Sequence, residues 1–198
     1  MVFDYPKHPH RRKHGPIGYK NYEQYRPWLR DDFCFRCVYC LRREQWGLVT
    51  GNWDIDHFQP QSLAPEKALD YENLLYACRT CNLNKSADLV CNPCQVALGD
   101  LVAVDTEGVI RSLNDEGEFL IQALNLNNKD YRRFRRQWLS ILSAVKQQNP
   151  SLFIELMSYP DELPNLIPLK PPSGNSRPEG VTDSYFARRE KGELPEVY

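Results

Sequence analysis

The sequence lacks three features that would each indicate a class of protein. Its net charge is only −1 over 198 residues, so any affinity for nucleic acid must come from local basic clusters and not from a global positive field. No apolar run approaches the roughly 20 residues that span a bilayer. The start, Met-Val-Phe-Asp-Tyr-Pro-Lys-His, lacks the apolar core of a signal peptide. We therefore expect a cytoplasmic protein made of one domain with appendages.

Histidine is also scarce. Three of the four histidines lie in the basic N-terminal stretch, at His8, His10 and His14, and only His57 lies in the body of the chain. A histidine site in the folded body can therefore use His57 alone. Residues 1–18 combine Pro, Gly, His and basic residues without apolar periodicity, which predicts a flexible basic arm. In such an arm His8 and His10 would bind metal only adventitiously.

Cysteine, by contrast, is plentiful. In a reducing compartment the seven cysteines are not expected to form disulfides, and their spacing is typical of thiolate metal ligands. Two Cys-x-x-Cys pairs supply four thiolates, which close a tetrahedral shell around a structural Zn²⁺. The cysteines are arranged as Cys34-x-x-Cys37-x-x-Cys40, Cys78-x-x-Cys81 and Cys91-x-x-Cys94.

The predicted zinc ligands are one pair from each side of a candidate active site: Cys37, Cys40, Cys78 and Cys81. Cys34 with Cys37 is a competing choice for the first pair, because the triple spacing permits either. Cys91 and Cys94 could join Cys34 in a second zinc site, but a fourth ligand is missing. Small buried thiols are the simpler interpretation of this third pair.

The chain around the first two cysteine groups predicts a small α+β core within residues 19–95. Aromatic side chains spaced by three in residues 19–29 favour a short helix. Residues 48–56 look like a turn and a short strand that ends at an Asp-His pair. After a loop over residues 58–70, residues 71–77 look like the return strand that leads into Cys78-x-x-Cys81.

Residues 96–158 predict a hairpin and a helical extension. The hairpin is expected over residues 102–110, with its turn at Asp105 to Gly108. A longer helix should begin near Lys129, capped by Asn127 or Asn128. Its apolar residues recur at three and four, so they share one face while basic residues occupy another that could meet phosphate. These basic residues are Lys129, Arg132, Arg133, Arg135 and Arg136.

The end of the chain is rich in proline. Asn149-Pro150 should end the long helix, and Ser151 can cap one more short helix through Met157. Residues 159–198 are predicted to be a strap or a disordered tail.

Asp56 and His57 are candidates for the hydrolysis of a phosphodiester. That reaction needs an activated water and a group that stabilises charge on the phosphate. A neutral imidazole can take the proton from water. Asp56 and Asn82 offer oxygen ligands to one divalent metal, which suits Mg²⁺. Lys85 follows Asn82 by one helical turn and could contact a phosphate. From the Asp-His dipeptide alone, a structural histidine would be the favoured interpretation.

The combination of motifs resembles the HNH endonuclease family, which has the ββα-metal fold. The resemblance covers about residues 33–90 and rests on these segments: Asp56-His57 followed by Pro60, Tyr71-x-Asn73-Leu74, Cys78-x-x-Cys81-Asn82-x-x-Lys85, and Cys37-Val38-Tyr39-Cys40 upstream.

The resemblance implies roles for the central residues. His57 corresponds to the general base, and Asp56 and Asn82 to ligands of a catalytic Mg²⁺ or Mn²⁺. Asn73 corresponds to the asparagine that holds the loop and orients the histidine. The last motif position is often histidine, and Asn82 is a departure that leaves metal binding plausible while disfavouring softer metals. Contacts to nucleic acid are expected from Lys85, Arg79, Arg42 and Arg43.

These observations predict a metal-dependent endonuclease with DNA as the favoured substrate and RNA as the alternative. In outline the chain also resembles HNH nucleases of bacterial antiviral defence systems, where the nuclease works beside an ATPase or another protein partner. Two other hypotheses stay open at this point. The chain could be a zinc-containing module that binds nucleic acid without catalysis, or an effector subunit that is silent until a partner positions its substrate.

Overall fold

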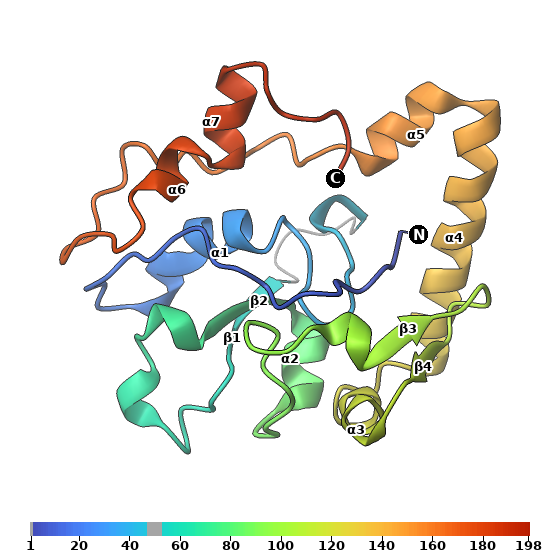
Figure 1. Cartoon of the computed structure of the whole chain (residues 1–198), viewed down its shortest axis with the longest axis horizontal. Helices are drawn as coiled ribbons and strands as arrows, with labels where there is room; N and C mark the ends of the chain where they lie inside the picture. The colour runs from blue at the N-terminus through green and yellow to red at the C-terminus, as the bar shows by residue number, and fades with distance from the viewer. Residues whose placement is uncertain (1, 47–52) are drawn as a thin grey trace.

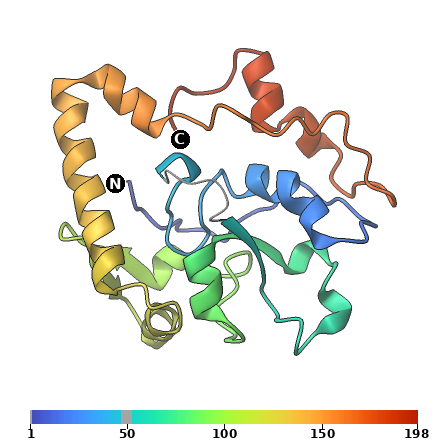
Figure 2. The same ribbon diagram turned by 180° about the vertical axis from the view of Figure 1, so that it is seen from behind.

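The structure is a computed structural model that describes residues 2–46 and 53–198. It combines one long and several short helices with two separate two-stranded sheets, which confirms the predicted α+β class. Figures 1 and 2 show a central unit of two strands and a helix, with one long helix along its side and the C-terminal segment across its edge. The turn expected over residues 48–52 lies outside the described residues. Within the described chain, no helix is both long and apolar enough to cross a membrane.

The central unit is an antiparallel hairpin followed at once by a helix. Strand β1, Trp53–His57, pairs with strand β2, Leu74–Cys78, in a register that sets Trp53 opposite Cys78 and His57 opposite Leu74. All five residues of β2 are buried. Helix α2, Arg79–Lys85, starts where β2 ends and packs on both strands. The predicted ββα order is therefore present.

A short helical segment precedes this unit. A 3-10 turn, Tyr22–Tyr25, leads into α1, Arg26–Asp32, which has a proline in its first turn, where no helical hydrogen bond is lost. Trp28 and Leu29 on α1 are fully buried. The predicted helix with a buried aromatic face is thus present, and it packs against β2.

The extension after residue 95 follows the prediction closely. Strands β3, Val102–Val104, and β4, Ile110–Ser112, form the hairpin, and α3, Asp115–Ala123, follows it. Helix α4, Lys129–Gln148, begins after Asn128, whose side chain accepts hydrogen bonds from the backbone N–H groups of Asp130 and Tyr131. This is the predicted cap, because an asparagine oxygen satisfies the free N–H groups of a first turn.

One capping prediction was wrong. Helix α5, Pro150–Met157, is capped by Asn149 and not by Ser151, because the Asn149 side chain accepts a hydrogen bond from the N–H of Leu152. Pro150 occupies the first helical position, which suits its fixed φ and missing N–H.

The prediction of a flexible N-terminal arm was also wrong, since residues 2–18 pack against the body. Phe3 and Tyr5 are buried, and the Tyr5 hydroxyl donates to the carbonyl of Tyr39 over 2.7 Å. His14 is fully buried. The arm has no apolar periodicity because it is an extended segment whose few large side chains enter pockets of the core.

The C-terminal tail is a strap that carries two short helices, α6, Glu179–Thr182, and α7, Tyr185–Glu190. It is joined to the N-terminal arm at Asp31, a buried carboxylate at the end of α1. Asp31 accepts hydrogen bonds from the side chains of Lys13 and His14 and from the N–H of Tyr185. Burial alone would raise the pKa of Asp31, but the His14 hydrogen bond and the Lys13 charge hold it below its usual value. Both ends of the chain are thereby fixed to one helix.

Candidate active site and zinc centre

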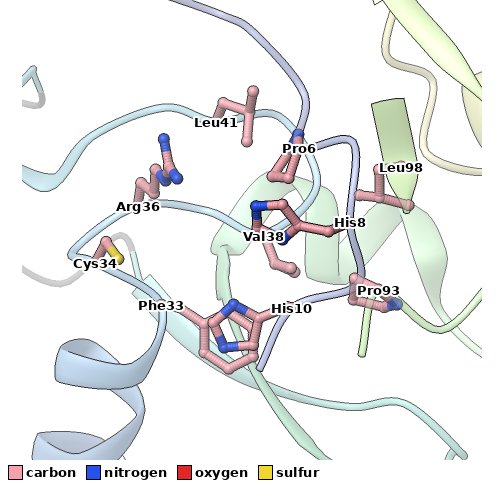
Figure 3. Close-up of a pocket in the computed structure, with 10 residues that line it drawn as sticks. All are labelled: Pro6, His8, His10, Phe33, Cys34, Arg36, Val38, Leu41, Pro93 and Leu98. Carbon is pink, nitrogen blue, oxygen red and sulfur yellow. The ribbon is translucent and has the colours of Figure 1, made fainter. Parts of the chain in front are cut away.

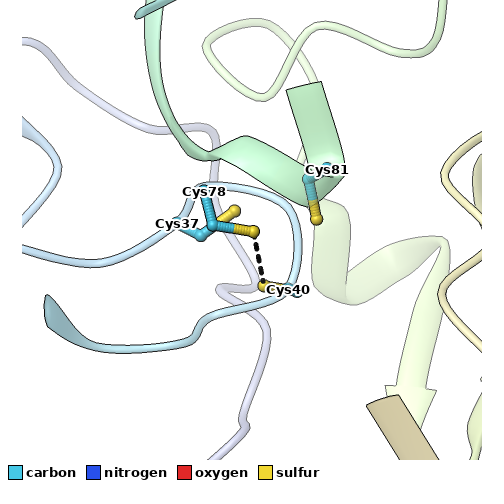
Figure 4. Close-up of side chains that lie close together, drawn as sticks. All are labelled: Cys37, Cys40, Cys78 and Cys81. Carbon is cyan, nitrogen blue, oxygen red and sulfur yellow. Dashed lines mark hydrogen bonds between the residues drawn. The ribbon is translucent and has the colours of Figure 1, made fainter. Parts of the chain in front are cut away.

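Four cysteine sulfurs gather at the junction of the hairpin and α2. The sulfurs of Cys37, Cys40, Cys78 and Cys81 lie within 4.8 Å of one another, and all four residues are buried. Figure 4 shows the four side chains pointing toward one centre. The Cys40 and Cys78 sulfurs are 3.7 Å apart. A tetrahedral Zn²⁺ with Zn–S bonds of about 2.3 Å places its sulfurs about 3.8 Å apart, so the cluster fits a structural zinc ion.

The backbone explains why these four meet. The loop that carries the first pair is held to the second strand, because the N–H of Val38 donates to the carbonyl of Tyr76 over 3.0 Å. Cys78 ends β2, and Cys81 lies in the first turn of α2. The end of a hairpin strand and the start of a helix therefore bring together two pairs whose nearest members, Cys40 and Cys78, are 38 positions apart in the chain.

The cluster also contacts a residue far along the chain. The hydroxyl of Tyr131, in the first turn of α4, lies 3.5 Å from the sulfurs of both Cys78 and Cys81. Burial raises the pKa of Tyr131, so the phenol stays protonated and can donate to a thiolate. Outer hydrogen bonds of this kind orient metal ligands and tune the affinity for the metal.

The other three cysteines lie apart from the cluster. The sulfur of Cys34 lies 2.8 Å from the hydroxyl of Tyr185, so the competing pair of Cys34 with Cys37 is not used. Cys91 and Cys94 are half-buried. Among the described residues, the only group of three or more cysteine, histidine or acidic side chains arranged for a metal is the four-cysteine cluster. The alternative of a second zinc site is therefore not supported.

His57 lies at the end of β1 with a partly exposed ring. Its Nε2 is 3.0 Å from the carbonyl oxygen of Ala68, and the Tyr22 ring stands nearly perpendicular to the imidazole, at 81° and 5.0 Å between centroids. A carbonyl can only accept, so this bond favours the tautomer with the proton on Nε2. In that tautomer Nδ1 carries the lone pair that a general base requires. The side-chain amide nitrogen of Gln61 lies 3.0 Å from Nε2 and 3.5 Å from Nδ1, so Gln61 is a direct neighbour of both ring nitrogens.

Asn73 closes the loop that bears Ala68. Its side chain accepts from the N–H of Gln59 over 2.8 Å and donates to the carbonyls of Gln59 and Lys67. Asn73 is only 4% exposed, so these bonds are sheltered from water. Asn73 holds Lys67, the residue before Ala68, so it acts on His57 through the loop. Within the described chain, Asn73 makes no hydrogen bond to the His57 ring.

Asp56 is occupied by protein contacts. It is 2% exposed, its Oδ2 accepts from the Tyr39 hydroxyl over 2.6 Å, and its Oδ1 pairs with the Lys85 ammonium at 3.1 Å. Lys85 also donates to the carbonyl oxygen of His57 over 3.0 Å. Tyr39 belongs to the first cysteine loop, so a continuous set of bonds joins the zinc loop to the backbone of His57.

Asn82 faces a residue to which sequence reasoning gave no role. Its Nδ2 is 3.0 Å from Oδ2 of Asp54, and both side chains are partly exposed. Asp54 and Asp56 lie two apart on β1 and share the face that α2 covers. That alternation is the signal that could have identified Asp54. The structure brings Asn82 to Asp54, whereas Asp56 is turned to Lys85.

The sequence comparisons agree with this geometry. Residues 37–88 match the family model described as HNH endonuclease. Residues 37–88 are an HNH domain. The match contains the cysteine cluster, both strands of the central hairpin and α2, and leaves out both terminal segments and α4. No curated protein matches the chain.

The four basic residues expected to contact nucleic acid are placed differently around the HNH domain. Lys85 is fully buried and Arg43 is 4% exposed, so neither fits the expected contact. The Arg43 guanidinium donates to the carbonyl of Met157 and lies over the Tyr198 ring, where burial lowers its pKa to about 10. Arg42 lies over the Trp53 ring, half-buried, whereas Arg79 on α2 is exposed. Of the four, Arg79 is the one whose placement suits a phosphate.

A small cavity of about 40 Å³ lies between the N-terminal arm and the first cysteine loop, and neither His57 nor Asn82 lines it (Figure 3). His10 stacks on Phe33 there, at 4.3 Å between ring centroids, and burial lowers the pKa of His10 to about 3. His8 and Cys34 also line the cavity. These residues do not form a metal-binding group within the described chain.

Proposed function

We propose that this protein is a metal-dependent endonuclease that hydrolyses phosphodiester bonds in DNA, with His57 as the general base. The observation that carries this proposal is the hydrogen bond between His57 Nε2 and the carbonyl oxygen of Ala68. Asn73 closes the loop that contains Ala68. That bond favours a basic Nδ1 on a partly exposed ring at the end of a rigid strand. A zinc module that only binds nucleic acid would have no need of a histidine oriented in this way.

The catalytic metal would be bound on the shared face of β1 and α2. Asn82 and Asp54 are neighbours in a partly exposed position, since the Asn82 Nδ2 donates to Asp54 Oδ2 over 3.0 Å, and each side chain has an oxygen that could bind a metal. Carboxylate and amide oxygens are ligands that suit Mg²⁺. When bound, Mg²⁺ or Mn²⁺ would stabilise charge on the phosphate and the leaving oxygen. Asp56 is the ligand that the family resemblance implies, but both its oxygens already have partners.

In this proposal the residues of the HNH domain divide the work. His57 takes the proton of the attacking water at Nδ1. Asn73 is a positioning residue that holds the loop, and the Lys85–Asp56 pair fixes the end of β1 to α2. The zinc cluster supports the same strand through Tyr39. In this proposal zinc would stabilise the fold of the site, while Mg²⁺ or Mn²⁺ would supply the chemistry.

Cleavage of supercoiled plasmid tests the activity directly. Purified protein with Mg²⁺ or Mn²⁺ should nick the plasmid, and a chelator should abolish nicking. His57→Ala should lower the rate by about 10²- to 10⁴-fold, as expected for loss of a general base. His8→Ala, which removes an exposed histidine of the N-terminal arm, is the matched control and should cleave like wild type. Equal nicking by wild type and His57→Ala would overturn the assignment.

Two aspartate variants separate the possible metal ligands. Asp54→Asn should weaken Mn²⁺ binding, measured by calorimetry on zinc-loaded protein, and leave the melting temperature nearly unchanged. Asp56→Asn leaves the Lys85 ammonium buried without its carboxylate and should cost about 3–5 kcal/mol of stability. If Asp56→Asn abolishes Mn²⁺ binding without loss of stability, while Asp54→Asn binds normally, Asp56 is the ligand after all.

The expected link to a defence-system ATPase remains a prediction. Plasmid, single-stranded DNA and RNA compared under the same conditions would identify the substrate class. Activity that appears only when a co-purified partner is present would instead favour the partner-activated effector.

A further inference from the structure

Helix α4 concentrates positive charge in a chain that has almost none overall. Its 20 residues contain six basic side chains and one acidic one, a formal charge of +5 in a protein whose net charge is −1. The rest of the chain is therefore acidic on balance. The comparison with the HNH family does not cover this helix.

Four of the exposed basic residues of α4 share one face at its N-terminal end. Lys129, Arg132, Arg133 and Arg136 follow the spacing i, i+3, i+4 and i+7 and are all exposed. The opposite face is buried, since Tyr131 and Leu142 enter the core and Trp138 stacks on Trp46 at 4.4 Å between centroids. We call the four exposed residues the α4 basic stripe. It points away from the core along the first two turns of the helix.

The fold does not account for the stripe. Residues three or four apart on a helix are neighbours, so the stripe contains four like-charge pairs, each of which disfavours the helix. An ordinary solvated face would alternate acidic and basic residues. Yet within residues 2–46 and 53–198 no stripe residue forms an ion pair. Uncompensated repulsion of this kind is relieved when a polyanion binds.

The stripe is also mechanically joined to the catalytic unit. Tyr131, one residue before Arg132, contacts the sulfurs of Cys78 and Cys81, and Asn82 directly follows Cys81. Figure 2 shows the lower part of α4 beside α2, in agreement with this contact. The first turn of α4 is thus fixed relative to the helix that carries Asn82.

We propose that the α4 basic stripe binds the phosphate backbone of duplex DNA and holds it against the HNH domain. This inference rests on the proposed function for the identity of the ligand. A straight line of cations with no exposed aromatic side chain between them fits a regular duplex backbone. Proteins that bind single strands add aromatic rings on which bases stack. The aromatic residues of this helix, Tyr131, Phe134 and Trp138, instead pack toward the core.

The test measures binding of a short duplex as a function of salt, in a His57→Ala background that prevents cleavage. Arg132→Gln, Arg133→Gln and Arg136→Gln are combined in one full-length, zinc-loaded protein. Three phosphate contacts contribute about 2.7 to the slope of log K against log salt. We therefore expect the slope to fall by about 2–3 and the Kd at 0.1 M salt to rise at least about tenfold. The matched control combines Arg11→Gln, Lys20→Gln and Lys170→Gln, three exposed cations of the two terminal segments, and should change the slope by less than about 1.

Stability supplies a second measurement. Glutamine is a good helix former and removes the like-charge pairs, so the triple α4 variant should melt at or slightly above the wild-type temperature. A lower melting temperature would indicate a structural role for the stripe and count against the proposal.

The outcomes separate this inference from the proposed function. If wild type cleaves plasmid and the triple α4 variant keeps the wild-type slope and Kd, the inference is overturned and the function stands. If the stripe variant loses duplex binding but wild type never cleaves, the interface stands and the catalytic proposal fails. Tighter binding of single-stranded DNA or RNA than of duplex would overturn the duplex assignment.

Discussion

Cys37-x-x-Cys40 and Cys91-x-x-Cys94 have the same spacing in the sequence, yet the structure treats them differently. The sulfurs of the first pair lie within 4.8 Å of those of Cys78 and Cys81, whereas Cys91 and Cys94 are half-buried and lie outside that cluster. The first pair sits on a loop that is hydrogen-bonded to β2, the strand that ends at Cys78. Spacing shows that two thiols can share a metal, and the pairing of distant backbone segments decides whether they do.

The largest effect should come from breaking the four-cysteine cluster. Cys78→Ser removes one of four zinc ligands at the point where β2 meets α2, and we expect loss of the cooperative thermal transition, because zinc binding and folding are coupled in such sites. Circular dichroism melting measures the change. Cys91→Ser changes a cysteine outside the cluster and is the control, which should melt within a few degrees of wild type. A Cys78→Ser protein that melts like wild type would refute a structural zinc.

Removal of the metal should reproduce the cysteine substitution in the wild-type protein. Metal analysis should find about one zinc per chain, and a strong chelator should remove it together with the tertiary fold. The fold should return when zinc is restored under reducing conditions. Two equivalents of zinc would show that Cys91 and Cys94 bind metal as well. The two Cys-x-x-Cys pairs would then not differ in metal binding.

A smaller effect is expected from the outer hydrogen bond of the cluster. Tyr131→Phe keeps the ring and removes the hydroxyl that lies 3.5 Å from two sulfurs. Zinc affinity, measured by competition with a chromogenic chelator, should fall about 10- to 100-fold. Tyr22→Phe, a change outside the cluster, should leave zinc affinity unchanged. Unaltered zinc affinity in Tyr131→Phe would show that α4 merely packs beside the site.

The smallest effect concerns the reactivity of Cys91, which lies outside the four-cysteine cluster. Burial, reinforced by the charge of Glu116, raises the pKa of Cys91 to about 11 from the usual 9. The thiol form is therefore favoured, and at pH 8 the thiolate population is about 100-fold below that of an ordinary cysteine. Alkylation of Cys91, followed by mass spectrometry, should be slow and should accelerate about tenfold per pH unit up to about pH 11. Fast alkylation that levels off near pH 9 would contradict this.

Local patterns predicted much of the fold. The turn between β3 and β4, the Asn128 cap of α4 and the Asp-His pair at the end of β1 all depend on neighbours within a few residues. The N-terminal arm could not be predicted in this way. It has no period of its own, and Tyr5 is ordered by Tyr39, 34 residues away.

The candidate site also has a part that local sequence predicts and a part that it does not. Asp56, His57 and Asn82 could be selected from residue type and motif, but their partners could not. Lys85 was expected at a phosphate because a lysine one turn after Asn82 shares its helix face, yet it lies fully buried against Asp56. The side-chain position depends on how closely α2 packs on β1, and that packing involves residues that are distant in sequence.

By itself, the sequence determined the chemistry that is available: four thiolates for zinc, one histidine in the body, and a basic face on a long helix. Only the tertiary structure decided which cysteines meet, that Asn82 faces Asp54, and that the first turn of α4 touches the zinc cluster. The physical reason is the range of the interactions. Ligand type and helical period are fixed within a few residues, whereas burial and hydrogen-bond partners are set when segments far apart in the chain pack together.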